Sequence, residues 1–405
     1  MKPESISTIV KRVASSEHPT KWIERKRSAY ALALAIVVGL GVVVTPSARA
    51  QTFKVLHAFA GADGQEPLAG LILANGTLYG TTVSGGAHGS GAVFKLDNQN
   101  KETVLYSFAD LGDGANPYGR LVRDAAGNLY GTTYINGSKG GGVVFKLSGK
   151  TETVLHNFGA GSDGSGPTAG LVMDSTGNLY GTTSKGGTGH CSGGCGTVFK
   201  VTKAGKETVL YNFKAGTDGY EPLAGLVRDG AGNLYGTTYG GGAGYGTVFK
   251  VTSAGKETVL HSFNFSDGAN PYGGLVRDAK GNLYGTTTIG GIGAGNVFKL
   301  DARGKETVLY NFTGGADGWH PEAGLILYTN GNLYGTTVEG GNPQVSAGVV
   351  FEVHATGGET VLHSFTVTDG RNPVADLVRD AAGNLYGTTK LGGAGNRGVV
   401  FKLTP

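Results

Sequence analysis

Apolar residues recur along this chain in short runs that are separated by turn-forming residues. In one representative stretch the runs are Gly119–Asp124, Asn128–Thr133, Val143–Leu147 and Glu152–Phe158. They are rich in Val, Thr, Tyr and Phe, which is typical of β-strands. No segment keeps an apolar period of 3.6 residues. The pattern therefore predicts an antiparallel meander of four strands and almost no helix.

The same unit occurs seven times. Each copy contains Asn-Leu-Tyr-Gly-Thr-Thr or a close variant, with the tyrosine at Tyr79, Tyr130, Tyr180, Tyr235, Tyr284, Tyr334 and Tyr386. Successive tyrosines are 49 to 55 residues apart. A period of this size, filled with short strands, is typical of sheets arranged around an axis. We therefore expect an all-β fold, a seven-bladed β-propeller of four-stranded antiparallel blades.

The two ends of the repeat region indicate how the ring closes. Lys54–Phe59 matches the fourth strand of a repeat, whereas the chain ends on Val399–Leu403, which matches a third strand. Residues 52–59 are therefore expected to pair with the C-terminal strand and complete the last blade. Such closure leaves no unpaired edge for aggregation. An open β-solenoid and a six-bladed ring with an extra sheet are the alternatives.

Two connectors recur between the strands. The segment from Asp124 to Asn128 suits a type I turn that ends on a left-handed glycine. The other connector is Asp-Gly-x-x-Pro, which begins at Asp63, Asp113, Asp163, Asp218, Asp267, Asp317 and Asp369. Seven aspartates at one mouth of a ring are a possible site for a hard cation. Asx-type turns followed by a stiffening proline are the simpler interpretation, which we favour.

The repeat resembles a known family. The sequence Gly-Asn-Leu-Tyr-Gly-Thr-Thr-x-x-Gly-Gly, followed by Gly-x-Val-Phe-Lys and Glu-Thr-Val-Leu, is similar to the GloVer-type tandem repeat of bacterial secreted proteins, sometimes labelled choice-of-anchor proteins. The similarity extends over residues 52–405. It implies an exported, propeller-like repeat domain. Members often end in a surface-sorting tail, whereas this sequence ends at Thr404 and Pro405, directly after a strand.

Residues 1–50 differ from the rest and match an export signal. Lys21, Arg25, Lys26 and Arg27 precede an apolar run from Ala29 to Val44. Ala48-Arg49-Ala50 offers the small residues of a cleavage site. We therefore predict a signal peptide over residues 1–50 and a propeller domain over residues 51–405. An uncleaved membrane anchor is the alternative, but the run is shorter than the roughly 20 residues that span a bilayer.

Removal of this segment changes the charge of the protein. Residues 1–50 contain eight Lys or Arg and three Glu, so subtracting them from the chain totals of 34 and 30 leaves a net charge near −1. The remaining cations are dispersed over the repeats, whereas a phosphate-binding surface needs them clustered. We therefore expect no nucleic-acid partner. After cleavage we also expect no membrane span, and a periplasmic or extracellular location.

Binding residues are expected on one face of the ring. In a four-stranded meander, the loops that join the fourth strand to the next blade and the second strand to the third emerge together. These loops differ between repeats. Their aromatic, acidic and basic residues are the predicted binding residues, namely Tyr220, Glu221, Tyr245, Trp319, His320 and Arg371.

Two other features have structural interpretations. Cys191 and Cys195 are the only cysteines, and in an exported protein they are expected to form a disulfide. A metal site with His190 lacks a fourth ligand and the usual spacing. A fourth-strand position alternates between His and Tyr, at His57, Tyr106, His156, Tyr211, His261, Tyr310 and His363, and propeller symmetry should keep these residues apart.

Three functions fit the sequence. The favoured one is an exported interaction module that presents its loops to an extracellular ligand, which is a glycan, a peptide or a protein. The alternatives are a propeller enzyme of the lyase or hydrolase type with an axial active site, and a structural envelope protein. No nucleophile, metal or acid–base cluster stands out from the repeat. We name no catalytic or metal-binding residue and no cofactor, and we expect a monomer.

Overall fold

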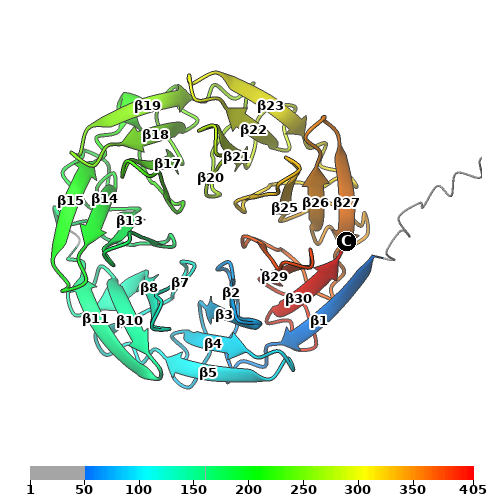
Figure 1. Ribbon diagram of the computed structural model, residues 1–405, viewed down its shortest axis with the longest axis horizontal. Coiled ribbons are helices and arrows are strands. Elements are labelled where there is room, and N and C mark those ends of the chain that lie inside the picture. The colour runs from blue at the N-terminus through cyan, green and yellow to red at the C-terminus, as the bar shows by residue number, and fades with distance from the viewer. Residues whose placement is uncertain (1–50, 160) are drawn as a thin grey trace, which may run out of the picture. The chain divides into compact units, whose positions relative to one another are not determined.

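The computed structural model describes residues 51–159 and 161–405. Over these residues the chain forms seven four-stranded antiparallel sheets around a central axis (Figure 1), together with one two-stranded sheet. The single helical element of this part is a short 3-10 turn, η1 (Gly216–Asp218). The prediction of an all-β, seven-bladed propeller is confirmed. The predicted signal peptide lies outside the described residues and stays a prediction.

The first four blades follow one another along the chain. Blade 1 contains β2 (Ile72–Ala74), β3 (Thr77–Thr82), β4 (Ala92–Leu96) and β5 (Glu102–Ser107). Blade 2 contains β7 (Val122–Arg123), β8 (Leu129–Thr133), β10 (Val143–Ser148) and β11 (Thr151–Asn157). Blade 3 contains β12 (Val172–Met173), β13 (Leu179–Thr183), β14 (Thr197–Val201) and β15 (Glu207–Asn212). Blade 4 contains β16 (Val227–Arg228), β17 (Leu234–Thr238), β18 (Thr247–Val251) and β19 (Glu257–Ser262).

The remaining blades complete the circle. Blade 5 contains β20 (Val276–Arg277), β21 (Leu283–Thr287), β22 (Asn296–Leu300) and β23 (Glu306–Asn311). Blade 6 contains β24 (Ile326–Leu327), β25 (Leu333–Thr337), β26 (Val349–Val353) and β27 (Glu359–Ser364). Blade 7 contains β28 (Val378–Arg379), β29 (Leu385–Thr389), β30 (Val399–Thr404) and β1 (Thr52–Ala58). In each blade the strands are called A to D from the axis outward.

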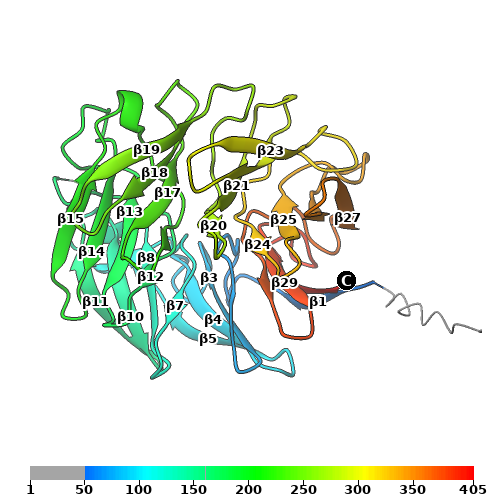
Figure 2. The ribbon, with the colours of Figure 1, turned by 45° about the horizontal axis from the view of Figure 1, so that its top comes forward.

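The two chain ends share blade 7, as predicted. Strand β1 pairs antiparallel with β30, so that Thr52 lies opposite Thr404 and Ala58 opposite Val399. Both views of the ribbon show β1 and β30 side by side (Figures 1 and 2). The N-terminal strand therefore completes the last blade.

The A strands are shorter than the sequence pattern predicts. In blade 2 the expected strand Gly119–Asp124 is reduced to Val122–Arg123. Its first residues contact the neighbouring blades instead. The guanidinium Nε of Arg120 donates to the carbonyl of Leu71 in blade 1 at 3.1 Å. Close to the axis, this side chain therefore reaches the backbone of the neighbouring blade, and the start of the A strand does not pair within its own blade.

Each residue of the recurring Asn-Leu-Tyr-Gly-Thr-Thr motif has a packing role. In blade 2, Leu129 and Tyr130 are buried, and the hydroxyl of Thr132 donates to the carbonyl of Ala169 in blade 3 at 3.1 Å. Gly131 is required by close approach, because a Cβ there would lie 2.7 Å from the ring of Phe145. The motif thus ties its own B strand to the C strand and to the next blade.

The hydrophobic core lies between the blades. Buried residues form seven clusters, and each cluster joins two adjacent blades. At the centre of each junction, the phenylalanine that follows one D strand meets the C-strand phenylalanine of the next blade edge-to-face. The seven pairs have ring centroids 5.0 to 5.2 Å apart: Phe59–Phe94, Phe108–Phe145, Phe158–Phe199, Phe213–Phe249, Phe263–Phe298, Phe312–Phe351 and Phe365–Phe401.

The turn between the A and B strands is closed by side chains. In blade 2, Asp124 accepts hydrogen bonds from the backbone and side chain of Asn128, at 2.8 and 2.7 Å, and from the hydroxyl of Tyr130 at 3.0 Å. Partial burial opposes ionisation of Asp124, but these hydrogen bonds outweigh it and lower its pKa. The structural role predicted for this aspartate is confirmed. In blade 6, where Tyr328 replaces it, the Tyr334 hydroxyl donates to Glu352 at 2.9 Å.

Six glutamates at the starts of the D strands are partly buried in the outer part of the junctions. Each has one carboxylate oxygen, Oε1, that is buried without a hydrogen-bond partner. Burial, together with an aspartate of the Asp-Gly connector, raises the pKa of each from 4.5 to about 7, at Glu102, Glu152, Glu207, Glu257, Glu306 and Glu359. At the corresponding place in blade 7, Phe53 stacks on His363 with ring centroids 3.7 Å apart.

Ring closure by β1 predicts that the junction between blades 7 and 1 is as strong as the others. Phe59→Ala should lower the free energy of unfolding by about 3–5 kcal/mol, because a fully buried phenylalanine is lost. Phe213→Ala, at an internal junction, is the matched control and should cost a similar amount. Urea unfolding of residues 51–405 measures both. A Phe59→Ala protein as stable as the unaltered one would contradict the closure.

The six glutamates predict that stability falls as the pH rises from about 4.5 to 7. In this window the unfolded chain has lost these protons while the folded chain still holds them, so folding is favoured at the acidic end. His156 and His261, whose pKa values are lowered by burial, act in the opposite direction but are only two.

Urea midpoints across this window measure the effect. Glu257→Gln should reduce the pH dependence and stabilise the protein above pH 7, because glutamine carries no charge to bury. Stability that rises from pH 5 to pH 7.5 would contradict the prediction.

Candidate functional site

The two kinds of variable loop lie on one face of the ring and pair with each other. The backbone of Tyr220, in the connector before blade 4, exchanges hydrogen bonds with Gly240, in the loop between the B and C strands of that blade, at 3.0 and 3.3 Å. In blade 2 the corresponding segments form the two-stranded sheet of β6 (Asp113–Ala115) and β9 (Ile135–Gly137). We call this side of the ring the loop face.

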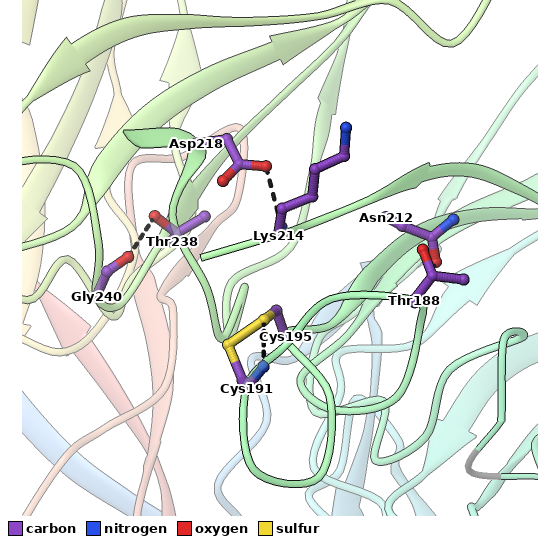
Figure 3. Close-up of a disulfide and its surroundings, with 8 residues drawn as sticks. All are labelled: Thr188, Cys191, Cys195, Asn212, Lys214, Asp218, Thr238 and Gly240. Atoms are coloured by element: carbon purple, nitrogen blue, oxygen red, sulfur yellow. Dashed lines mark hydrogen bonds between the residues drawn. A yellow bond between two sulfur atoms is a disulfide. The ribbon is translucent and has the colours of Figure 1, made fainter. Parts of the chain in front are cut away.

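The aspartates of the Asp-Gly connectors bond within their own loops. Asp218 accepts a hydrogen bond from the hydroxyl of Tyr211 at 2.7 Å. It accepts a second from the backbone N–H of Lys214 at 3.0 Å (Figure 3). In the other connectors the same D-strand position, His or Tyr, also lies beside the aspartate, as in His57 and Asp63 at 2.8 Å. The His and Tyr residues are thus kept apart on separate blades, as predicted. The aspartates of the Asp-Gly connectors therefore stabilise their own turns.

A cavity of about 910 Å³ lies on the axis and is lined by the inner strands of all seven blades. The lining follows the inner segments of the blades from the residue after each connector proline onward, and we call the seven residues at that first position the entrance ring. The members are Leu68, Tyr118, Thr168, Leu223, Tyr272, Glu322 and Val374, and all but Thr168 line the cavity. Here the repeats differ in kind, from aliphatic to aromatic to acidic.

Two tyrosines of the entrance ring line the cavity, and each of them packs on a second tyrosine that does not line it. Tyr118 packs edge-to-face on Tyr134 of its own blade, with ring centroids 5.6 Å apart. Tyr272 packs in the same way on Tyr239 of blade 4, at 6.5 Å. Tyr118 and Tyr272 come from blades 2 and 5, which lie on opposite sides of the ring (Figure 1). The four tyrosines therefore form two edge-to-face pairs on opposite sides of the axis.

The pKa values of Tyr272 and Glu322 are both raised by partial burial. Burial raises the pKa of Tyr272, and the nearby Glu322, Tyr118, Tyr239 and Tyr134 add to the shift. Burial also raises the pKa of Glu322, while Lys390 lowers it and Glu339 raises it. Lys390 on blade 7 and Glu339 on blade 6 thus act electrostatically on Glu322, and neither of them lines the cavity. We call the four tyrosines, Glu322 and Lys390 the funnel.

A second ring of residues lies two positions after the entrance ring in each blade. Five of its members are glycine, and the other two are Arg120 and Asp376. A Cβ on Gly70 would lie 3.0 Å from Asp376 and 3.4 Å from Arg120, so these two side chains flank blade 1. Asp376 accepts the backbone N–H of Gly324 at 2.6 Å. An acidic and a basic side chain, Asp376 and Arg120, thus line the cavity beside blade 1.

Blades 2 and 5 share a glycine directly after the entrance-ring tyrosine. Tyr118 and Tyr272 are each followed by glycine, where the other blades have alanine. A Cβ on Gly119 would lie 2.4 Å from the carbonyl of Ala169, and one on Gly273 equally close to that of Ala323. The glycines let these A strands approach the next blade, and the preceding tyrosines stand at the channel entrance.

The six binding residues predicted from sequence lie on the loop face, but none of them lines the axial cavity. Tyr220, Trp319 and Arg371 pair with the loop of their own blade. Tyr245 packs on Phe265, with ring centroids 5.4 Å apart. The structure brings only Trp319 and His320 together, with ring centroids 4.4 Å apart. As a binding set they stay a prediction.

Glu221 and His320 occupy a strained backbone position. Their φ angles are 53° and 56°, and their N–H groups donate to carbonyls of the preceding blade at 3.0 and 3.2 Å. Glu66 in blade 1 shares this conformation, and the remaining blades have asparagine or glycine here. Asparagine adds a side-chain bond to the preceding blade, as Asn116 does to Val83 at 2.9 Å. The left-handed conformation is uncommon for glutamate, whereas histidine is found in it more often.

The longest of these loops carries the disulfide. Cys191 and Cys195 are bonded, with Cα atoms 5.0 Å apart, and Cys195 is buried (Figure 3). The predicted disulfide is confirmed, and it fits an exported protein, because such bonds persist in oxidising compartments. Among residues 51–159 and 161–405, no three His, Cys, Asp or Glu residues gather closely enough to hold a metal ion. No helix of this part is long and apolar enough to span a bilayer.

The entrance ring was not among the binding residues predicted from the sequence, because those residues lie within the loops and the ring begins directly after each connector proline. A comparison of the residue after that proline across the seven repeats would have revealed it. Five kinds of side chain occur there, whereas the packing positions nearby scarcely change. The pairing of Tyr118 with Tyr134, by contrast, needs the fold to be known.

Known proteins support the fold and the family. A profile of the Gloeobacter/Verrucomicrobia repeat matches residues 32–244 and 240–405. The chain belongs to this repeat family. A search of curated proteins finds no match.

Two solved structures share the fold of this repeat protein at low sequence identity. The extracellular domain of a candidate one-component system from B. thetaiotaomicron is 12% identical with a TM-score of 0.56, and the match covers 87% of this chain and 41% of that one. A candidate 6-phosphogluconolactonase from Bacteroides uniformis is 18% identical with a TM-score of 0.50, covering 77% and 88%. At these identities the likeness shows the propeller fold alone.

The local bonding of the connector aspartates predicts no cation-dependent stability. Calcium at about 5 mM should leave the melting temperature unchanged, because each aspartate is already engaged within its turn. Asp218→Ala should cost about 1–3 kcal/mol, since the Tyr211 hydroxyl and the Lys214 N–H lose their acceptor. Thermal unfolding measures both. A rise of several degrees with calcium that Asp218→Ala abolishes would contradict the turn role.

Proposed function

We propose that the protein is an exported binding module that takes a small polar organic molecule into the funnel. The observation that carries this proposal is the local loss of repeat symmetry. The motif residues that pack the blades are nearly the same in all seven copies, whereas the entrance ring changes chemistry from blade to blade and converges on one cavity. Side chains that converge on a concave, partly apolar site are what ligand recognition requires.

The funnel combines two kinds of contact. The tyrosine rings supply flat apolar faces, and their hydroxyls supply hydrogen bonds at the same place. Glu322, Lys390, Arg120 and Asp376 add charged donors and acceptors that fix an orientation. A cavity of about 910 Å³ is large enough for a drug-sized or smaller molecule. Such a site suits a molecule with both an apolar face and a polar edge.

A propeller enzyme with an axial active site is the second candidate. Two carboxyl groups at the same cavity favour it. Burial favours the protonated form of Glu322. Asp376 of blade 7 accepts a hydrogen bond from the backbone N–H of Gly324 in blade 6. Pairs of carboxyl groups in different environments are used as acid and base in hydrolysis. The fold likeness to a candidate lactonase agrees with this candidate but does not identify a reaction.

Thermal unfolding with a library of sugars, amino acids, nucleosides and organic acids tests the proposal. A ligand at 100 times its Kd stabilises the folded state by about 2.7 kcal/mol, so true binders should raise the melting temperature clearly. The Tyr118→Ala, Tyr272→Ala double variant should lose at least about tenfold in affinity, because two stacking faces are removed.

Tyr328→Ala removes an exposed tyrosine from the turn between the A and B strands of blade 6, outside the funnel. It is the matched control and should bind normally. Hits that bind the double variant as well as they bind the unaltered protein would refute the funnel as the site. A library without any hit would also count against it. A hit that is consumed during the measurement, with turnover lost in Glu322→Gln, would favour the enzyme over the binding module.

A further inference from the structure

Blade 6 departs from the repeat at four positions at once. Its connector carries Trp319 and His320, its entrance residue is Glu322, and its loop between the B and C strands contributes Glu339. At the place of Glu339 the other blades have Ser84, Ile135, Lys185, Gly240, Ile289 and Leu391, so it is the only acid of that set. Glu322 is likewise the only acid of the entrance ring.

These four residues form a continuous path from the rim to the axis. The ring of Trp319 lies 4.4 Å from that of His320, and its backbone N–H donates to the Glu339 carbonyl at 2.7 Å. The Nδ1 of His320 lies 3.9 Å from a carboxylate oxygen of Glu339. Glu322 follows His320 by two residues in the chain and lines the cavity. Trp319 remains 38% exposed, so its ring is available to a ligand.

The backbone along this path supports a functional role for His320. It keeps a φ of 56°, where asparagine in blades 2, 5 and 7 both tolerates the conformation and bonds the preceding blade. His320 makes no such bond and instead lies between Trp319 and Glu339. The His320 side chain thus takes no part in tying blade 6 to blade 5 and instead contacts two residues of its own blade's loops.

The charges of the path and the funnel indicate a neutral ligand. The cavity lining holds both signs of charge, with Arg120, Arg123 and Arg228 against Glu322 and Asp376, so neither an anion nor a cation matches the site as a whole. At the rim, Lys185 lies 5.9 Å from the centre of the Tyr134 ring and opposes a cation there. A neutral molecule with apolar faces and hydroxyl-bearing edges matches alternating aromatic rings and carboxylates. Sugars have this character.

Resting on the function proposed above, we propose that the ligand is a neutral oligosaccharide. Its terminal ring enters the funnel between Tyr118 and Tyr272, and its following rings run outward along blade 6 to stack on Trp319. The segment from Trp319 to Glu322 spans about 10 Å at most, so a short oligosaccharide can reach from the channel to the tryptophan. Chain length should therefore decide affinity.

Titration calorimetry with neutral gluco-, xylo- and galacto-saccharides, each as monosaccharide and hexasaccharide, tests this inference on the full propeller. The best hexasaccharide should bind at least about tenfold more tightly than its monosaccharide, because stacking on one tryptophan is worth about that much. Trp319→Ala should bring the hexasaccharide down to the monosaccharide's affinity and leave the monosaccharide unchanged.

Two further variants separate this role from a loss of stability. His320→Asn should weaken hexasaccharide binding several-fold while raising the melting temperature, because asparagine suits the left-handed position and can bond the preceding blade. Tyr328→Ala, which removes an exposed tyrosine from the turn between the A and B strands of blade 6, should change neither affinity. Normal hexasaccharide binding by Trp319→Ala would overturn the outward path. If monosaccharide binding still disappeared in Tyr272→Ala, the proposed function would stand.

The sugar assignment has its own outcome. If no saccharide of the panel binds, or only charged sugars or peptides bind in a parallel titration, the ligand class is wrong. The function proposed above would then still be judged by the small-molecule library and the tyrosine double variant, which make no assumption about sugars.

Discussion

The edge-to-face pair of phenylalanines between adjacent blades is the contact on which the rest of the structure depends. It recurs at every junction, and the glycine after each motif tyrosine exists to make room for one of its rings, as Gly131 does for Phe145. Aromatic pairs of this geometry contribute about 0.5–1.5 kcal/mol beyond the area they bury. Because a ring is stable only if every junction holds, the repeat leaves its packing residues little freedom, and Phe59 must supply the seventh junction from the other end of the chain.

That constraint decides where the blades can differ. Residues that face a neighbouring blade are fixed by packing, and those at the turns are fixed by hydrogen bonds such as Tyr130 to Asp124. The residues after the connector prolines face the axial cavity instead, where little packing is demanded of them. Tyr118, Tyr272 and Glu322 stand at these positions. The same logic explains why blade 6 can carry Trp319 and Glu339 on its exposed loops without disturbing its junctions.

Most of the fold could be predicted from the sequence, because its determinants are local and repeated. The strand runs, the turn at Asp124 and the disulfide of Cys191 with Cys195 all follow from neighbouring residues. The pairing of β1 with β30 followed from counting strands. The A strands were predicted too long, since the contact of Arg120 with Leu71 depends on how close the blades come near the axis. The candidate site was largely missed, because Tyr118 and Tyr272 are distant in sequence and meet only when the ring closes.

The central claim is that a uniformly packed ring confines recognition to its axial entrance and to the path along blade 6. A crystal structure of the protein with the saccharide that stabilises it most would test this claim most directly. We predict density for a sugar ring between Tyr118 and Tyr272, continuing outward toward Trp319. Density confined to another part of the loop face, such as Tyr220 or Tyr245, with an empty funnel would contradict the account.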